Sequence, residues 1–399
     1  SLLNRDDAGF AKRIPFGGAT RTRISSQCLK KHWRDHKGPL SLLALCDGDK
    51  VQMAVRSRKS FERFVIEPML SVGVARAVAD RIATELQKLV FKGKSADAKP
   101  KKDDEAESES PEVGDGGKSN QITVLGRREL AYLAGLALDL ASDPDFGKAM
   151  PQSDGKAKKK AEDPIAAAIK AKLGKDGLEA NLKALGRGAE GLDAAVFGRM
   201  VTSDILSRTD AAVHVAHAFT VHREDSESDY FSAVDELVSE AGELGSGHIN
   251  STELTTGLYY GYVVVDVELL RQNLQGLEAD VASDVVEVLI HTITSVSPGA
   301  KKGSTAPYSR AHLVLVEAGD AQPRSLANAF LKPVKADDLQ ANAFKAMGKH
   351  LQELDAMYLT GEARKAAAIG TKDALQFADA TWVASVAELA HWAAEQIKE

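Results

Sequence analysis

The spacing of apolar residues predicts helices in the middle and at the end of the chain. In residues 128–141, apolar side chains recur at the three- and four-residue intervals that place them on one face of a helix. Two polar stretches, residues 93–118 and 152–163, have too few large apolar residues to form a core. We therefore expect residues 61–200 to be helical, with two solvated interruptions. The helical spacing returns near the C-terminus, at Trp382, Val386, Leu389, Ala393 and Ile397.

A period of two replaces this spacing in the segment after residue 209. Between residues 210 and 222, apolar and polar positions alternate as they do in a strand. The residues that share the apolar face are Val213, Val215, His217, Phe219 and Val221. Further strands are predicted at residues 258–267 and 312–317. Strands on both sides of a helical block indicate an α+β fold that is interrupted by a helical insertion.

Composition narrows the class of protein. The chain has 399 residues, of which 44% are hydrophobic, enough for two or three domain-sized units. The two cysteines, Cys28 and Cys46, form no CxxC pair, which argues against a disulfide framework and a cysteine-based zinc site. No apolar run approaches the roughly 20 residues of a membrane span, and the first residues lack a signal-peptide pattern. We therefore expect a cytoplasmic protein that binds no membrane.

The charge of the chain is distributed unevenly. The net charge is −6, yet residues 1–37 contain nine Lys or Arg and three Asp or Glu, a local net charge of +6. The other 362 residues (399 minus 37) therefore sum to −12. A local excess of positive charge in an acidic protein indicates a site for a polyanion, such as the backbone of a single-stranded nucleic acid.

A basic segment, which we define as Arg5 to Arg34, carries most of this positive charge. Its residues 19–25 alternate between the two faces of an extended chain. Before this stretch, the glycines of Phe16-Gly17-Gly18 would let backbone amides approach an anion closely. The cationic face of the stretch is predicted to consist of Arg21, Arg23 and Ser25.

A short helix is predicted after this strand, and Ser25 and Ser26 are good N-caps for it. Strand, loop and helix together predict a grip on a phosphate chain, with salt-sensitive affinity and little reading of bases. The alternative is a solvated basic helix that is anchored to a core, which explains any single Arg or Lys better. The predicted basic face consists of Gln27, Lys30, Lys31 and Arg34, and the anchoring face of Leu29 and Trp33.

No catalytic constellation is found in the sequence. On a strand, His214 lies opposite His217, which spoils chelation of a metal, whereas on a helix the two would share a face. The paired carboxylates Asp6-Asp7 and Asp235-Glu236 are explained by capping or by salt bridges. We therefore expect no enzyme, no metal and no other cofactor. The alternative hypothesis is a metal-dependent ribonuclease that uses the cluster from His214 to His222 or these carboxylates.

Two further patterns have ordinary structural explanations. Tyr230 and Phe231 lie between charged runs, so one of them could stack on bases, although an aromatic pair in a hairpin is more often core. A second basic region, from Lys156 to Lys175, borders a predicted helix, and its pattern is typical of a solvated lysine face. A third hypothesis, a binder of a phosphorylated small molecule through Phe16-Gly17-Gly18, lacks a Walker or dinucleotide spacing.

Several short motifs, read in order, resemble one family. They are LNRDD at 3–7, FGG at 16–18, RISSQCLK at 23–30, FGRM at 197–200, VAHAFTVH at 215–222, DYFSAVDE at 229–236, PGAK at 298–301 and SLANAFLKPV at 325–334. The set is similar to that of the CRISPR-associated Cascade backbone subunit, CasC type, of type I-E systems. The resemblance covers nearly the whole chain.

The resemblance implies an RRM-like (ferredoxin-like) palm, a helical fingers insertion and a β-hairpin thumb. It also implies that copies of the subunit polymerise along one CRISPR RNA (crRNA) guide, beside other Cascade subunits, and that the guide pairs with target DNA. The implied parts are the N-terminal palm at 1–50, the fingers at 51–208, a palm strand at 209–222, the thumb at 223–255, the C-terminal part of the palm at 256–345 and C-terminal helices at 346–399.

The resemblance further implies roles for single residues. The RNA contacts that it matches are Arg5, Lys12, Ser25, Gln27, Lys30 and Arg34. The residues with which the thumb would interrupt the base stacking of the guide are Met200, Phe231 and Ser232. The lysines with which the fingers would attract duplex DNA are Lys156, Lys158, Lys159, Lys160, Lys170 and Lys172.

The chain departs from the family pattern in three places. The first palm strand of the family precedes LNRDD, so we expect that residues before Ser1 are missing or that the palm is incomplete. The insertion at 93–118 has no counterpart in the pattern, and its role is unassigned. No RNP1 aromatic motif occurs, so the palm is not expected to read sequence as some RRM domains do.

Overall fold

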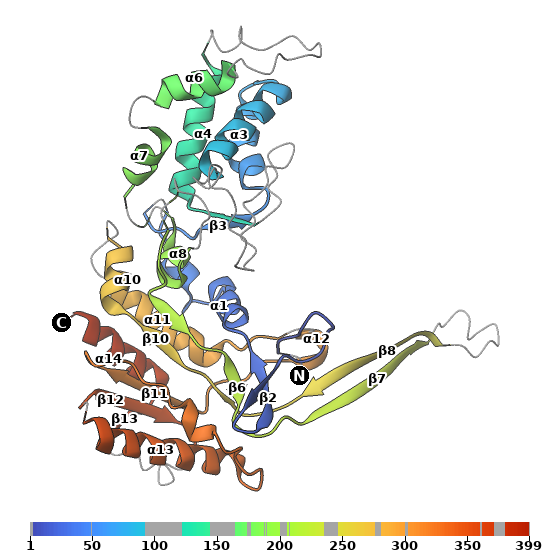
Figure 1. The fold of residues 1–399 in the computed structure, drawn as a ribbon, viewed down its shortest axis with the longest axis vertical. Helices are drawn as coiled ribbons and strands as arrows, with labels where there is room; N and C mark the ends of the chain where they lie inside the picture. The colour runs from blue at the N-terminus through green and yellow to red at the C-terminus, as the bar shows by residue number, and fades with distance from the viewer. Residues whose placement is uncertain are drawn as a thin grey trace, which may run out of the picture. The chain divides into compact units, whose positions relative to one another are not determined.

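The computed structural model has the α+β fold that the apolar spacing predicts (Figure 1). The chain groups into two compact units. The first consists of Ser1–Leu45, His214–Val265 and Ala282–Glu399, and the second of Cys46–Val213 and Asp266–Val281. The residues that the structure describes are 3–48, 50–91, 122–143, 164–173, 177–186, 188, 190–199, 206, 208–234, 246–275, 281–299, 302–359, 361–370 and 380–398.

A four-stranded antiparallel sheet lies in the first unit. Its strands, in spatial order, are β1 (Arg13–Phe16), β2 (Ala19–Ile24), β6 (Ala218–Thr220) and β9 (Tyr259–Tyr260). Aromatic rings pack along the sheet, with centroid distances of 4.9 Å for Phe16 and Phe219 and 5.8 Å for Phe219 and Tyr260. Phe330 continues this row at 5.4 Å from Tyr260. These contacts anchor the strands that carry the basic segment.

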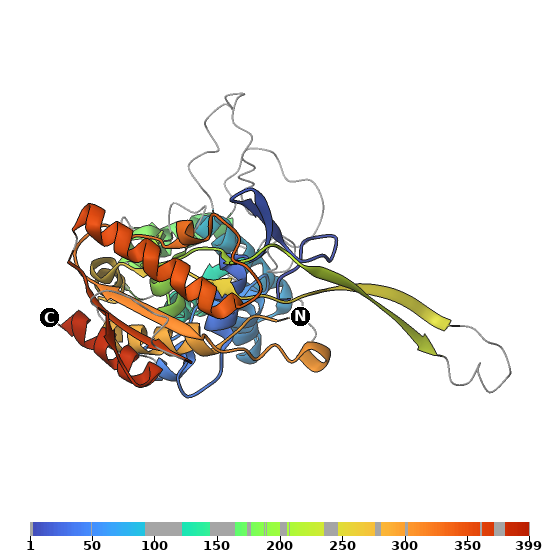
Figure 2. The ribbon, with the colours of Figure 1, turned by 90° about the horizontal axis from the view of Figure 1, so that it is seen from below.

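A long β-hairpin projects from the first unit (Figure 2). Its strands β7 (Ser226–Val234) and β8 (Ser246–Thr255) pair antiparallel, from Ser226 opposite Thr255 to Val234 opposite Ser246. The register shifts once, between Ala233 and Val234. The β-hairpin that is predicted within residues 223–255 is therefore present.

A second sheet of the first unit is covered by a helix on each face. Its strands are β11 (Leu313–Ala318), β12 (Ala363–Ala368) and β13 (Thr381–Trp382), and its helices are α13 (Leu339–Tyr358) and α14 (Val386–Lys398). Leu313 and Leu315 pack in the cluster that contains residues of α13, whereas Val314 and Val316 pack in the cluster that contains residues of α14. Burial on both faces explains why β11 is apolar at consecutive positions. Trp382 belongs to β13, so the predicted C-terminal helix begins four residues later than its apolar spacing suggests.

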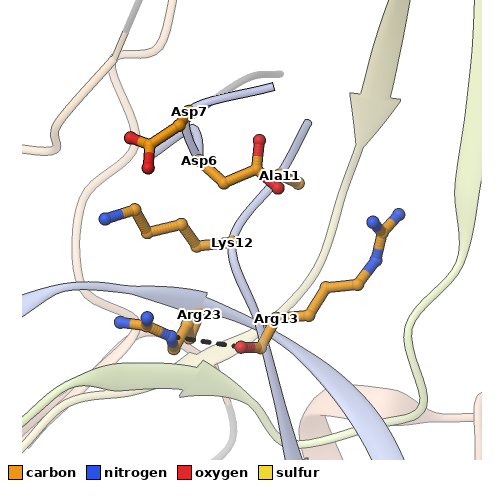
Figure 3. Close-up of a pocket in the computed structure, with 6 residues that line it drawn as sticks. All are labelled: Asp6, Asp7, Ala11, Lys12, Arg13 and Arg23. Carbon is orange, nitrogen blue, oxygen red and sulfur yellow. Dashed lines mark hydrogen bonds between the residues drawn. The ribbon is translucent and has the colours of Figure 1, made fainter. Parts of the chain in front are cut away.

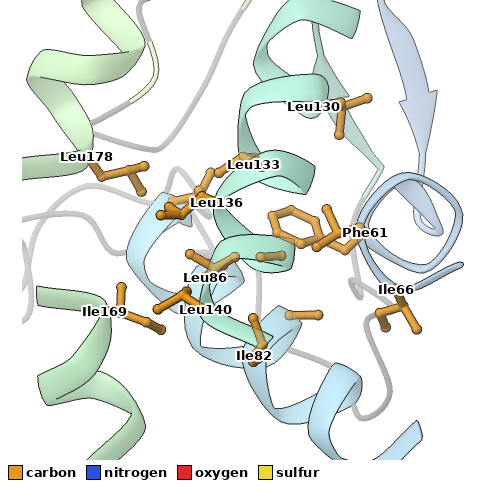
Figure 4. Packing of buried hydrophobic residues seen from close by; sticks show 14 of the residues in the cluster. Phe61, Ile66, Ile82, Leu86, Leu130, Leu133, Leu136, Leu140, Ile169 and Leu178 are labelled. Carbon is orange, nitrogen blue, oxygen red and sulfur yellow. The ribbon is translucent and has the colours of Figure 1, made fainter. Parts of the chain in front are cut away.

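Helices form the core of the second unit (Figure 4). They are α3 (Arg76–Phe91), α4 (Arg127–Ala141), α6 (Pro164–Leu173) and α7 (Gly177–Lys183). Ile82 and Leu86 of α3 pack with Leu133 and Leu140 of α4, and all four side chains are at most 1% exposed. The helix predicted at residues 128–141 is therefore confirmed.

The remaining elements connect these parts. In the first unit they are α1 (Ser26–Asp35), η1 (Leu42–Leu45), β10 (Val263–Val265), α11 (Val281–Ser295, whose first residue is the last of the second unit), α12 (Lys302–Thr305) and η5 (Ala327–Phe330). In the second unit they are β3 (Val55–Ser57), η2 (Glu62–Ile66), α2 (Glu67–Ser71), β4 (Thr123–Leu125), α8 (Leu192–Phe197) and α10 (Val267–Asn273). The strand β5 (Val213–Val215) begins at the last residue of the second unit.

Two predicted strands are each divided in the structure. Residues 210–222 form β5 and β6 instead of one strand, because the chain changes partner: β5 pairs with β10, and β6 pairs with β2 and β9. Residues 258–267 form β9 and β10 for the same reason, and Asp266 then caps α10 by accepting a hydrogen bond from the Leu269 amide at 2.9 Å. The strand predicted at 312–317 is confirmed as β11.

Two other expectations concern the polar stretches of the chain and membrane-spanning helices. The predicted solvated interruptions, 93–118 and 152–163, lie outside the described residues. Within the described residues, every helix is too short or too polar to cross a membrane.

Candidate nucleic-acid interface

A small turn at the N-terminus holds the first part of the basic segment. Arg5 and Ala11 form an antiparallel bridge, and Arg5 is half-buried there. Asp6 closes the turn between them: its carboxylate accepts a hydrogen bond from the Phe10 amide at 2.9 Å, and its own amide donates to the Phe10 carbonyl at 2.8 Å. Asp6 therefore has a structural role, as predicted for the Asp6-Asp7 pair, although its carboxylate closes a turn and does not cap a helix.

The glycine pair of the basic segment forms the turn between β1 and β2. Gly17 and Gly18 have φ values of 61° and 73°, as the favoured two-residue turn of a hairpin requires. A Cβ atom on Gly17 would lie 1.7 Å from the carbonyl oxygen of Leu331, so no larger residue fits there. The turn and this contact explain both glycines without a bound anion.

Helix α1 has the anchoring face that the sequence predicts. Leu29 and Trp33 are 8% and 3% exposed. Ser25 is the N-cap, and its hydroxyl accepts a hydrogen bond from the Cys28 amide at 3.3 Å. The predicted projection of Ser25 from a cationic face is wrong, because the residue is 6% exposed and its hydroxyl caps the helix.

Arg21 also differs from its prediction. Its side chain is fully buried and does not project with Arg23 from a cationic face. Its Nη1 donates to the carbonyl oxygens of Thr220 at 2.9 Å and His222 at 3.2 Å, and its Nη2 donates to that of Phe330 at 2.8 Å. Burial lowers the pKa of this guanidinium from its ordinary value. Arg21 therefore joins β2 to two other segments of the fold.

The cationic side chains that remain accessible include Lys12 and Arg23 (Figure 3). They extend to the same side of the chain, and the Arg23 Nε donates to the Arg13 carbonyl at 3.1 Å. Neither Lys12 nor Arg23 forms an ion pair with a residue that the structure describes. Both line a cavity of about 350 Å³. The other lining residues are Asp6, Asp7, Ala11 and Arg13.

The basic face of α1 is partly neutralised. Asp35 accepts hydrogen bonds from Lys31 Nζ at 2.9 Å and from Arg34 Nε at 3.1 Å. Burial raises the pKa of Asp35, but the hydrogen bond from Lys31 and the charge of Arg34 outweigh it and hold the pKa below its ordinary value. Gln27 is exposed, and Lys30 is half-buried with a pKa that burial lowers. The face is therefore less positive than its sequence suggests.

His217 is a neighbour of Lys12 and Arg23 that the sequence places on the apolar face of a strand and in a candidate metal cluster, but not in the basic segment. Its Nδ1 accepts a hydrogen bond from the Ser26 amide at 3.1 Å, at the N-terminus of α1. Burial lowers the pKa of His217, and the charges of Arg23 and Lys12 lower it further. A neutral ring whose Nδ1 accepts has its proton on Nε2, so His217 adds a hydrogen-bond donor beside the two cations.

The predicted histidine cluster does not converge on a metal. His222 uses both ring nitrogens for backbone groups: Nδ1 donates to the Arg223 carbonyl at 2.6 Å, and Nε2 accepts from the Leu258 amide at 3.3 Å. His214 is exposed. Within the described part of the chain, no three His, Cys, Asp or Glu side chains are grouped as metal ligands would be.

Sequence reasoning missed the partners of Arg13. The guanidinium of Arg13 forms ion pairs with Glu224 and Glu253, which are 211 and 240 residues away in the chain. No local pattern reveals a pair at such separation. Arg13 therefore differs from Lys12 and Arg23, although all three line the same cavity.

The predicted thumb and DNA contacts lie mostly outside the described side chains. Phe231 and Ser232 lie in β7, opposite Asn250 and Ile249, and only their backbone is described. Tyr230, the preceding residue, is 64% exposed. Lys170 and Lys172 belong to α6, and the Lys172 side chain is exposed. The predicted residues outside the described part are Met200, Lys156, Lys158, Lys159 and Lys160.

The arrangement defines a class of protein: an α+β chain with a projecting β-hairpin and an accessible basic segment at its N-terminus. Its fold is that of two solved chains. One, from a structure titled "CRISPR RNA-guided surveillance complex, pre-nicking", is 24% identical with a TM-score of 0.76, over 100% of this chain and 96% of the other. The second, titled "CRISPR RNA-guided surveillance complex", is 21% identical with a TM-score of 0.64, over 99% and 95%.

The family model of the CT1975-like protein matches residues 1–393. The chain belongs to this family. No curated protein sequence matches the chain significantly.

Proposed function

We propose that the chain is a non-catalytic subunit that forms the backbone of a type I-E CRISPR Cascade surveillance complex. In this proposal, copies of the chain polymerise along a crRNA guide, contact other Cascade subunits, and present the guide for pairing with target DNA in antiviral defence. The observation that carries the proposal is the pair of accessible cations Lys12 and Arg23, which we call the open pair because neither forms an ion pair within the described residues, at the base of a projecting hairpin. The fold that the chain shares with chains of CRISPR RNA-guided surveillance complexes supports it.

The structure revises which residues of the basic segment we propose as phosphate contacts. Arg21 and Ser25 are buried and have structural roles, so they are left out of the set. His217 joins it as a neutral donor beside two cations. The proposed phosphate contacts are Arg5, Lys12, Arg23, Gln27, Lys30, Arg34 and His217.

The type I-E assignment and the roles of the thumb and the fingers come from the motifs that the chain shares with the CasC type. Phe231, with Met200 and Ser232, would divide the guide into segments. Lys172 and the other lysines of the fingers would attract DNA. The accessible position of Tyr230 supports contact of this hairpin with a ligand, because an exposed aromatic ring has a face free for stacking on a base.

The proposal is tested by extracting nucleic acid from the purified protein and sizing it. We expect a discrete RNA of CRISPR length, and we expect added single-stranded RNA to bind cooperatively, with an affinity that falls as salt rises. A protein that purifies without nucleic acid and whose RNA affinity ignores salt would refute it. Incubation with labelled RNA and Mg²⁺ or Mn²⁺ tests the ribonuclease hypothesis, which requires metal-dependent scission.

A further inference from the structure

Arg13, in strand β1, connects strand β8 of the β7–β8 hairpin to the segment that leads into β7. Its Nε donates to Glu224 and its Nη2 donates to Glu253. Glu224 lies two residues before β7 begins, and Glu253 lies in β8 opposite Ser228. We call Arg13, Glu224 and Glu253 the clasp.

Backbone hydrogen bonds reinforce the clasp. The Ala11 amide donates to Glu253 Oε2 at 2.7 Å, so this carboxylate binds both the backbone and the side chain of the N-terminal segment. The Glu224 amide donates to the Thr20 carbonyl at 2.9 Å. Both ends of the base of the hairpin, Glu224 just before β7 and Glu253 in β8, therefore have a carboxylate on Arg13 and a second hydrogen bond to the N-terminal segment.

The clasp is more than a surface ion pair. The side chains of Glu224 and Glu253 are 12% and 9% exposed, and that of Arg13 is 37% exposed. The hydrogen bond to Glu224 raises the pKa of Arg13, and the charges of both carboxylates add to it against the effect of burial. Hydrogen bonds between ionised groups are stronger than those between neutral groups.

Arg13 is poorly suited to bind phosphate. Two carboxylates around one guanidinium leave the clasp with a net charge of −1, which repels an anion. Figure 3 shows that the Arg13 side chain extends to the side opposite Lys12 and Arg23. The alternation of an extended chain explains why the neighbours Lys12 and Arg13 have opposite directions.

The β7–β8 hairpin needs such a contact to have a defined direction. A two-stranded ribbon is marginally stable by itself. Figures 1 and 2 both show the ribbon extending away from the rest of the first unit, so its base determines where it points. The clasp lies at this base.

We propose that Arg13 is a positioning residue, which fixes the direction of the β7–β8 hairpin relative to Lys12 and Arg23 before any ligand binds. The proposal rests on the proposed function in one respect: the position of the hairpin matters for binding because hairpin and basic segment contact the same RNA. The clasp itself is tested on the protein alone.

Hydrogen exchange of the hairpin amides is the first test. The variants are Arg13→Gln, Glu253→Gln and the double variant, and Glu253→Gln keeps an oxygen for the Ala11 amide. We expect each single variant to speed the exchange of the amides near Ser226 and Thr255 by about tenfold or more. The double variant should add little to Arg13→Gln, because Glu253→Gln removes an ion pair that Arg13→Gln has already removed. The matched control, Lys12→Gln, leaves this exchange unchanged. Unchanged exchange in Arg13→Gln, or fully additive effects in the double variant, would overturn the proposal.

RNA binding provides the second test, with single-stranded RNA of CRISPR length at several salt concentrations. A positioning role predicts that Arg13→Gln and Glu253→Gln both weaken cooperative binding and that neither changes the salt slope. If Arg13 were a phosphate ligand, its loss would reduce the slope by about 0.7, and loss of the Glu253 charge would strengthen binding. If no RNA binds to the wild-type protein, the proposed function fails while the exchange experiment still decides the role of the clasp.

Discussion

Two clusters of cationic side chains in the first unit differ in how their charge is neutralised. In the carboxylate–arginine cluster, Arg324 and Arg364 meet Glu317 and Asp355 at nitrogen–oxygen distances from 2.6 to 3.2 Å. The four charges cancel, and the Arg364 side chain is 4% exposed. In the basic segment, by contrast, Lys12 is accessible and has no ion pair within the described residues.

The difference separates structural cations from cations that are available to a ligand. The carboxylate–arginine cluster joins β11, β12 and α13, and its guanidinium groups hold the pKa of Asp355 below its ordinary value against the effect of burial. No charge is left for a partner there. Lys12 and Arg23 form no ion pair within the described residues, so a polyanion would gain two contacts without breaking an internal ion pair. The clasp is intermediate, since Arg13 lies next to the open pair but has internal partners.

The largest expected effect comes from breaking the closed cluster. Replacement of Arg364 by Leu leaves Asp355 and Glu317 short of a partner, and we expect the free energy of unfolding to fall by about 3–5 kcal/mol. Thermal unfolding, together with hydrogen exchange of the amides of β11 and β12, measures this loss. Below the melting temperature of the variant, RNA affinity should equal that of the wild type. Weaker RNA binding by the folded variant would contradict the division between the two clusters.

A control for this prediction lies on α13, the helix that contributes Asp355 to the cluster. Lys349 and Glu353 form an exposed pair in α13, with the two side chains 75% and 61% exposed. Because exposed pairs of this spacing contribute only about 0.3–0.5 kcal/mol, Lys349→Ala should hardly change the stability. A loss as large as that of Arg364→Leu would mean that α13 is sensitive to any change.

The second prediction compares two arginines of one strand. Arg21→Met leaves the carbonyl groups of Thr220, His222 and Phe330 without their donor, and we expect a loss of about 1–3 kcal/mol in the free energy of unfolding. Arg23→Met should change the stability by less than about 0.5 kcal/mol, because the Arg23 side chain is partly accessible and makes one hydrogen bond.

RNA binding should give the reverse order. We expect Arg23→Met to weaken binding and Arg21→Met, measured well below its melting temperature, to leave it nearly unchanged. Chemical denaturation and RNA titration on the same two variants check both halves. The assignment of a structural role to Arg21 and an RNA-binding role to Arg23 fails in either of two cases: Arg21→Met is as stable as the wild type, or Arg21→Met weakens RNA binding and Arg23→Met does not.

The contrast between Arg21 and Arg23 also shows which features of the basic segment can be predicted from the sequence. Local periodicity correctly predicts α1, its cap at Ser25 and its buried Leu29 and Trp33, because these features depend on neighbours within one helix. The same periodicity places Arg21 and Arg23 on one face, and that face is partly covered. Phe330, one of the residues that accept from Arg21, lies 309 residues away, so no window of sequence contains the contact.

Long-range partners explain the other errors as well. The segment 210–222 has one alternating pattern, yet it is divided because β5 and β6 pair with different strands. Arg13 belongs to the basic segment by charge, but two glutamates more than 200 residues away give it an internal role. Charge counts along the chain identify where cations are concentrated, and only the fold shows which of them remain available.

The smallest expected effect concerns one open cation. Lys12→Gln removes a single proposed phosphate contact, so the slope of log affinity against log salt should fall by about 0.7, with the stability unchanged. Titrations of single-stranded RNA at several salt concentrations measure this slope, and Lys349→Gln is the matched control, since it removes an exposed lysine of the same unit at a distant position in the chain. An equal change of slope in both variants would mean that RNA responds to the total charge of the unit. A change in Lys12→Gln alone would support a specific phosphate contact at the open pair. Only a cation that binds an RNA phosphate releases a counterion from the RNA.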